Sequence, residues 1–195
     1  MEPDEMTEQI QNVQPQYEQG MKQDNNEDSQ QYLTFIMANE EYGVEILSVQ
    51  EIRGWESTTV IPNAPSHVKG VINLRGTIVP IIDLRQRFGI KVLDYGTTTV
   101  VIVVKVAIAS EHKVIGIVVD AVSDVFSVNN DDVRDVPNFG EDTDLSFIKG
   151  LTNAGEKMVI LLDINRLLGS EVLPEAEQLS QLMHNIDADK QVVNG

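Results

Sequence analysis

Two sequence motifs occur twice in this chain, in the same order. Residues 43–52 recur as residues 116–125, with glycine, aliphatic and acidic residues at matching positions. A second segment, which begins with Gly-x-x-Asn and ends with an aliphatic run and an aspartate, occurs at 70–83 and again at 150–163. An ordered duplication of two motifs is hard to obtain by chance. The chain is therefore predicted to contain two similar subdomains built on one plan.

Both copies end in the same signal for a short helix. Asp83 precedes Gly89 by 89 − 83 = 6 residues and Asp163 precedes Gly169 by 169 − 163 = 6, with a short apolar stretch between them. Aspartate is a favourable N-cap because its carboxylate accepts hydrogen bonds from free backbone N–H groups. Glycine suits the left-handed residue that ends a helix. We therefore expect two capped helical turns, and this interpretation is favoured over a pair of catalytic carboxylates.

Short segments rich in β-branched residues indicate many strands and little long helix. The predicted strands cover residues 32–38, 42–46, 51–61, 97–109 and 114–122, with turns at 39–41 and 111–113 and a bend at 47–50. Two further hairpins are predicted at 70–83 and 148–162. Arg75-Gly76 is the expected tip of the first, because glycine can take a positive φ. Closely spaced short strands are typical of an all-β fold of small barrels.

The two ends of the chain differ in composition from its middle. Residues 1–30 hold eight acidic residues and one lysine, without a sustained apolar period, which predicts a disordered acidic tail. Residues 31–169 form the predicted domain, with motif copies near 42–89 and 115–169. Residues 170–195 are predicted to form a C-terminal helix and tail.

Charge and composition exclude several classes of function. A net charge of −17 disfavours binding to nucleic acid or anionic lipid. Without cysteine the chain has no disulfide framework and no thiol nucleophile. It contains no P-loop, dinucleotide fingerprint or nucleophile elbow, so no catalytic residue, cofactor or metal is predicted. It has no secretion signal, and Lys105 interrupts its longest apolar stretch, so a cytoplasmic protein is expected.

One segment of this acidic chain is basic. Residues 69–91 contain five basic residues and one acid, which either meet an acidic partner or pair with the chain's own acids. Arg75 is expected to point outward from its hairpin tip, and arginine is well suited to anchoring an interface. Val49, Glu51 and Ile52 follow the predicted bend and could line a groove. For Val49 and Ile52 themselves, packing in the core is the favoured interpretation.

Four segments together carry a family resemblance, namely 40–54, 61–65, 68–85 and 116–124. In order and approximate spacing they resemble the CheW family of bacterial chemotaxis coupling proteins, over roughly residues 31–169. The resemblance implies an all-β fold of two SH3-like five-stranded barrels packed on a shared hydrophobic core, with short helical turns and a C-terminal helix. The duplication independently predicts two similar units.

The resemblance also implies a function and its contact residues. It implies a non-catalytic adaptor without cofactors that couples the cytoplasmic tip of methyl-accepting chemoreceptors to the regulatory domain of the histidine kinase CheA, in membrane-associated arrays. A receptor groove is expected at the junction of the barrels, and a kinase contact at one end of the first barrel. The expected receptor-binding residues are Val49, Glu51, Asn73, Arg75, Gly76, Val100 and Val122. The expected kinase-binding residues are Val60, Ile61, Val68, Gly70 and Val71. The alternative class is a small-ligand-binding or enzymatic β-barrel module, which requires a concentrated polar site.

Overall fold

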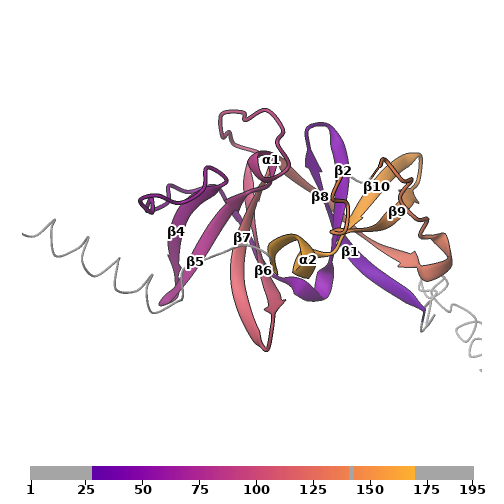
Figure 1. Ribbon diagram of the computed structural model, residues 1–195, viewed down its shortest axis with the longest axis horizontal. Helices are drawn as coiled ribbons and strands as arrows, with labels where there is room; N and C mark the ends of the chain where they lie inside the picture. The colour runs from indigo at the N-terminus through magenta and orange to yellow at the C-terminus, as the bar shows by residue number, and fades with distance from the viewer. Residues whose placement is uncertain (1–27, 141–142, 170–195) are drawn as a thin grey trace, which may run out of the picture.

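The computed structural model describes residues 28–140 and 143–169. Within these residues, ten strands form two sheets of five strands each (Figure 1). Sheet A has the order β8 (Ala121–Asn129), β1 (Ser29–Met37), β2 (Glu40–Glu45), β10 (Lys157–Leu162) and β9 (Ile148–Ala154). Sheet B has the order β3 (Val49–Gly54), β6 (Val100–Ile108), β7 (Glu111–Val119), β5 (Thr77–Asp83) and β4 (Val68–Leu74). The predicted all-β fold with few helices is confirmed.

The two sheets are related by the sequence duplication. If strands β1 to β5 are exchanged for β6 to β10, the strand order of sheet A becomes that of sheet B. Sheet A therefore takes the hairpin β1–β2 from the first copy and its other three strands from the second copy. Sheet B takes the hairpin β6–β7 from the second copy and its other three strands from the first copy. Equivalent parallel pairs, β2 with β10 and β7 with β5, join the two copies within each sheet.

Strand β6 explains the long aliphatic run in the sequence. Val101 and Val103 pack in a cluster on one face of sheet B, whereas Ile102, Val104 and Val106 pack on the opposite face. All five side chains are buried. Because successive residues of a strand point to opposite faces, a strand that is buried on both faces needs apolar residues at nearly every position.

A shared core fills the space between the sheets. It combines residues of sheet A, such as Phe35 and Leu162, with residues of sheet B, such as Ile82 and Ile117. Figure 1 shows helix α2 (Ile164–Gly169) between the two sheets, and its Leu167 is buried in the same core. Full burial of such a side chain contributes roughly 1.5–3 kcal/mol relative to exposure. The two sheets are therefore stabilised mainly by each other.

Both predicted helical turns are present, and both begin at the predicted aspartate. Helices α1 (Leu84–Arg87) and α2 each donate one backbone N–H to Oδ1 of the preceding aspartate, at 3.2 Å for Asp83 and 3.1 Å for Asp163. Gly89 ends the first turn with φ 68°, as predicted. Gly169 does not take a left-handed φ, because α2 continues through this residue, so that part of the prediction is wrong.

Several strand boundaries differ from the prediction. β3 ends at Gly54 rather than near residue 61, and the chain then crosses β4, where Thr59 pairs with Val71 as an isolated bridge. The hairpin tips lie earlier than predicted, because Ala38 and Ala109 both take left-handed φ values of 54° and close tight turns there. Alanine gives no sequence signal for this conformation.

Strand β8 is absent from the prediction, which ends the preceding strand at residue 122. The structure breaks this segment at Asp120, and the chain passes there from sheet B to sheet A. Much of β8 is exposed, and its single acid, Asp124, and its two serines mask the strand pattern.

The ends of the chain lie largely outside the described residues. This applies to the predicted C-terminal helix and to all of the predicted tail except residues 28–30. Of these three residues, Ser29 and Gln30 already belong to β1. Among the helices in residues 28–140 and 143–169, none has the length and apolar character needed to cross a membrane.

Candidate partner-binding surfaces

Four of the predicted receptor-binding residues gather where the outer strands of sheet B meet. Arg75 Nη2, at the β4–β5 tip, lies 2.9 Å from Glu51 Oε2 on β3, and the Arg75 side chain is 79% exposed. Asn73 Oδ1 accepts a hydrogen bond from Gly76 N at 2.7 Å and fixes the same tip. Arg75 and Gly76 have φ values of 51° and 88°. Sheet B therefore curls until β3 reaches the tip of the β4–β5 hairpin.

The three predicted receptor-binding valines are distributed over strands of both sheets. Val49, Val100 and Val122 are half-buried, and each packs against the shared core. Val49 and Val100 belong to sheet B, whereas Val122 belongs to sheet A, where it pairs with Phe35. The predicted packing of Val49 in the core is observed, but its neighbour Ile52 is exposed.

One exposed residue of this region is missing from the prediction. Leu47 is 89% exposed in the 3₁₀ helix η1 (Ile46–Ser48), which carries the chain from sheet A to sheet B immediately before Val49. Its signal in the sequence is a leucine inside a predicted bend, where neither strand can bury it. Leu47 therefore adds exposed apolar area two residues before Val49.

The predicted kinase-binding residues divide into exposed and buried groups. Val60 is 72% exposed and Ile61 is half-buried, so both can present side chains to a partner. Val68 is half-buried and packs against the shared core, whereas Gly70 and Val71 are buried. The last two residues therefore support the surface from below rather than forming it.

Gly70 and Val71 hold the segment that carries Val60. The backbone groups of Thr59 and Val71 exchange two hydrogen bonds of 2.9 Å. A Cβ on Gly70 would lie 2.2 Å from the Thr59 carbonyl oxygen, which is closer than real Cβ contacts allow. The second copy repeats this bridge between Arg134 and Leu151. At the hairpin tip, however, Arg75 has the uncharged Gly155 as its counterpart.

The basic segment is largely paired with groups of the same chain. Arg75 contacts Glu51, Arg85 contacts Asp120, and Lys69 Nζ lies 3.4 Å from the Gln86 side-chain oxygen. Of the two interpretations left open by the sequence, pairing with the chain's own acids therefore holds for Arg75 and Arg85. Only the Arg75 pair is at the surface.

Asp83 has a structural role. It caps α1 with one carboxylate oxygen and accepts the Tyr95 hydroxyl hydrogen bond with the other. Burial, together with Asp83, raises the pKa of Tyr95 above its ordinary value. The Tyr95 ring lies 4.2 Å from the ring of the half-buried Trp55, centroid to centroid. The residues that the structure describes contain no group of three or more His, Cys, Asp or Glu able to hold a metal ion.

Comparison with known proteins identifies the family. A family model described as the CheW-like domain matches residues 31–172. The chain is 45% identical over 152 residues to the chemotaxis protein CheW of Klebsiella aerogenes, covering 78% of this chain and 89% of that protein. It is 37% identical over 139 residues to CheW of Rhizobium meliloti, with coverages of 71% and 87%. The solved structure of scaffolding protein TtCheW from Thermoanaerobacter tengcongensis superposes with a TM-score of 0.64 at 33% identity, covering 74% of this chain and 97% of that one.

These relatives are named as chemotaxis and scaffolding proteins. The prediction of a non-enzymatic chemotaxis scaffold is therefore confirmed, and the alternative of an enzymatic or small-ligand module is not favoured. The extent of the match leaves one assignment: the chain belongs to the CheW family.

Proposed function

We propose that this chain couples methyl-accepting chemoreceptors to the histidine kinase CheA in membrane-associated arrays. The observation that carries the proposal is the surface pair Glu51–Arg75, which lies next to half-buried aliphatic residues close to the junction of two sheets. The arrangement offers shape and charge for binding a protein. It contains no reacting group.

The receptor would bind as a helix laid into this junction. An amphipathic helix places apolar side chains in a groove at helical spacing, and Val49, Val100, Val122 and Leu47 supply apolar surface of that kind. Each buried Å² of apolar surface contributes roughly 25 cal/mol before the costs of association are subtracted. The apolar contact would therefore supply most of the affinity.

The Glu51–Arg75 pair would select the partner and its register. Arg75 is held by one carboxylate contact, so its remaining guanidinium N–H groups can meet an acidic or carbonyl group of the receptor. Charged groups at an interface give specificity and fast association more than raw affinity. Because an exposed ion pair stabilises a fold by only about 0–1 kcal/mol, its loss should affect binding rather than folding.

The kinase regulatory domain would bind at the surface around Val60 and Ile61. Both side chains are available on a segment that the Thr59–Val71 bridge fixes to β4. This surface and the Arg75 tip involve different segments of sheet B. The two partners can therefore be tested separately.

A charge-swap series tests the receptor contact. Arg75→Glu should reduce co-sedimentation of the chain with receptor-bearing membranes about tenfold, because it removes an interface anchor and repels Glu51. Lys157→Glu is the matched control, since Lys157 forms a comparable exposed ion pair with Glu41 on sheet A, at 3.6 Å. Binding that is equally sensitive to both substitutions, or to neither, would remove Arg75 from the receptor site.

A further inference from the structure

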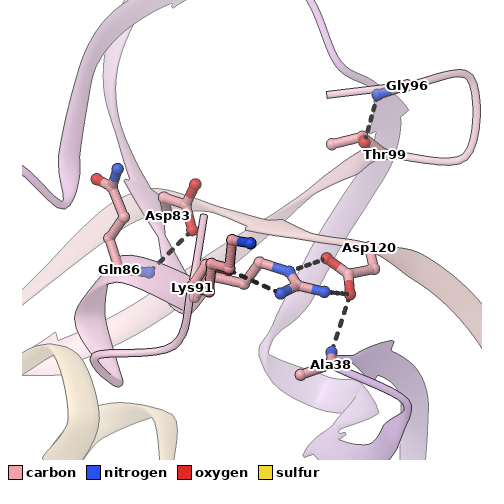
Figure 2. Close-up of polar contacts among 8 residues, drawn as sticks. Ala38, Asp83, Gln86, Lys91, Gly96, Thr99 and Asp120 are labelled. Carbon is pink, nitrogen blue, oxygen red and sulfur yellow. Dashed lines mark hydrogen bonds and ion pairs between the residues drawn. The ribbon is translucent and has the colours of Figure 1, made fainter. Parts of the chain in front are cut away.

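A single carboxylate connects segments from both sheets. Asp120 is the one residue between β7 of sheet B and β8 of sheet A. Its two oxygens accept hydrogen bonds from Arg85 Nε at 2.6 Å and Arg85 Nη2 at 2.5 Å. The second oxygen also accepts the Ala38 backbone N–H at 2.9 Å, and Figure 2 shows Asp120 next to Ala38.

The partners of Asp120 come from opposite sheets. Arg85 belongs to α1, which follows β5 of sheet B, whereas Ala38 lies in the turn between β1 and β2 of sheet A. The Asp120 backbone N–H also donates to Ile36 O of β1 at 3.1 Å. Asp120 thus connects three parts of the chain. These are its own crossover segment, helix α1 that follows sheet B, and the β1–β2 hairpin of sheet A.

Arg85 is well fixed in its place. It is only 9% exposed, and its Nη1 donates to the Lys91 carbonyl oxygen at 2.9 Å. The planar guanidinium presents its N–H groups in a rigid fork, so two parallel hydrogen bonds to one carboxylate define an orientation as well as a distance. The hydrogen bond to Asp120 raises the pKa of Arg85, and both groups are charged at neutral pH.

The other crossover between the sheets has no such connection. Its 3₁₀ helix η1 begins after Glu45 without a side-chain cap, and Leu47 is exposed there. At the position of Arg85, the second copy has Asn165, whose Oδ1 accepts the Ala107 N–H at 2.8 Å in an exposed, neutral contact. Glu45, the residue before η1, does contact Lys149 Nζ at 2.6 Å, but both residues belong to strands of sheet A. The two crossovers of the duplicated plan therefore carry different contacts.

This ion pair lies close to two of the proposed receptor-binding valines. Val122 follows Asp120 by two residues on sheet A, and Val100 on sheet B pairs with Val119, the residue before Asp120. We infer that Arg85 and Asp120 are positioning residues that fix how sheet A and sheet B are set against each other, and so fix the shape of the receptor-binding junction. The inference rests on the proposed function for its effect on binding, but not for its effect on geometry.

The geometry can be measured without any partner. The chain has no native cysteine, so Thr77→Cys on β5 and Asn153→Cys on β9, both exposed, can carry a pair of spin labels that report the distance between the sheets. Asp120→Asn should broaden this distance distribution, because the Arg85 guanidinium then loses its charged hydrogen-bond acceptor. Asn165→Ala, which removes the neutral counterpart at α2, should leave the distribution close to that of the parent. An unchanged distribution in folded Asp120→Asn would overturn the inference.

Binding affinity supplies a second measurement. A general loss of stability would not change the affinity for one partner and leave the other unchanged. Asp120→Asn should weaken binding to receptor-bearing membranes about fivefold or more, yet leave binding to the isolated kinase regulatory domain unchanged, since that surface lies on sheet B alone. Arg85→Lys keeps the positive charge but removes the two parallel hydrogen bonds of the guanidinium. It should weaken receptor binding in the same way as Asp120→Asn, but by less. Equal loss of both partners would indicate general unfolding and would contradict the positioning role.

The proposed receptor site can fail separately. If Arg75→Glu does not affect receptor binding but Asp120→Asn broadens the distance distribution, the positioning role stands and the receptor site is elsewhere. If Asp120→Asn fails to fold, Arg85→Lys supplies the same distance test.

Discussion

Gly70 lies against Thr59 so closely that a Cβ on the glycine would stand 2.2 Å from the Thr59 carbonyl oxygen. Gly70 also has φ 128°, a value that side-chain-bearing residues rarely adopt. This contact holds the segment after β3 against β4, and the segment carries the exposed Val60. The proposed kinase-binding surface therefore depends on a glycine that is itself buried.

Gly70→Ala should destabilise the fold by about 2 kcal/mol or more, from overpacking and backbone strain together. Urea denaturation measures this change. Gly54→Ala is the control, because a Cβ at Gly54 meets nothing within 4 Å and its φ is not left-handed. Similar stabilities of the two variants would show that the Thr59–Gly70 contact is looser than described.

Val60→Asp should weaken binding of the kinase regulatory domain about tenfold, because it places a charge in a contact that is proposed to be apolar. Its stability should change by less than about 0.5 kcal/mol, since the side chain is 72% exposed. Met158→Asp, at an exposed position on β10 of sheet A, is the matched control for adding a charge to an exposed apolar site. Calorimetric titration with the isolated domain distinguishes them, and equal affinities would exclude the Val60 surface.

Asp83→Ala should cost more stability than Asp163→Ala, although both remove a helix N-cap. The first also leaves the half-buried Tyr95 hydroxyl without its acceptor, so we expect about 2–3 kcal/mol. The second removes a cap and an exposed contact with Arg166 at 3.5 Å, so we expect about 1 kcal/mol.

Denaturation followed by Trp55 fluorescence gives both values, because Trp55 is the only tryptophan and its ring packs against Tyr95. Equal losses in Asp83→Ala and Asp163→Ala would mean that the Tyr95 hydrogen bond contributes nothing.

The Arg85–Asp120 pair should give a defined pH dependence. Burial opposes ionisation of Asp120, but the hydrogen bonds from Arg85 and from Ala38 N–H outweigh it and lower its pKa below the ordinary value. A lowered pKa in the folded state contributes stability that is present above the unfolded pKa of about 3.9 and is lost as the pH falls through the folded pKa. Wild type should therefore be more stable than Asp120→Asn at pH 7.

The difference in unfolding free energy between wild type and Asp120→Asn should persist at pH 5 and shrink only below about pH 4. Urea titrations at a series of pH values measure this difference. A difference in unfolding free energy that disappears between pH 7 and pH 5 would contradict an ionised Asp120 with a lowered pKa.

Much of the fold could be predicted from local signals. The alternating burial of Val101 to Val106 follows from an unbroken β-branched run, and the caps at Asp83 and Asp163 follow from the duplicated spacing. The exchange of hairpins between sheets could not be predicted, because it depends on which long-range strand pairs form. Strand β8 was missed because its exposed Asp124 and serines hide the alternation.

The sequence names candidate interface residues, but it does not give their geometry. Residue types mark Arg75 and Glu51 as interface residues, yet their contact depends on the curling of sheet B. The resemblance places Gly70 and Val71 among the kinase-binding residues, but they are buried because the segment after β3 folds across them. The Arg85–Asp120 pair joins residues that are 120 − 85 = 35 positions apart, and no local sequence pattern predicts it.

The most direct test of the proposed coupling is recruitment of the kinase to receptor-bearing membranes by this chain. Purified CheA should sediment with the membranes when wild-type chain is present and should remain largely in the supernatant when it is absent. Arg75→Glu and Val60→Asp should each abolish most of this recruitment, because one is proposed to break the receptor contact and the other the kinase contact. Kinase that sediments equally with and without the chain would contradict the account.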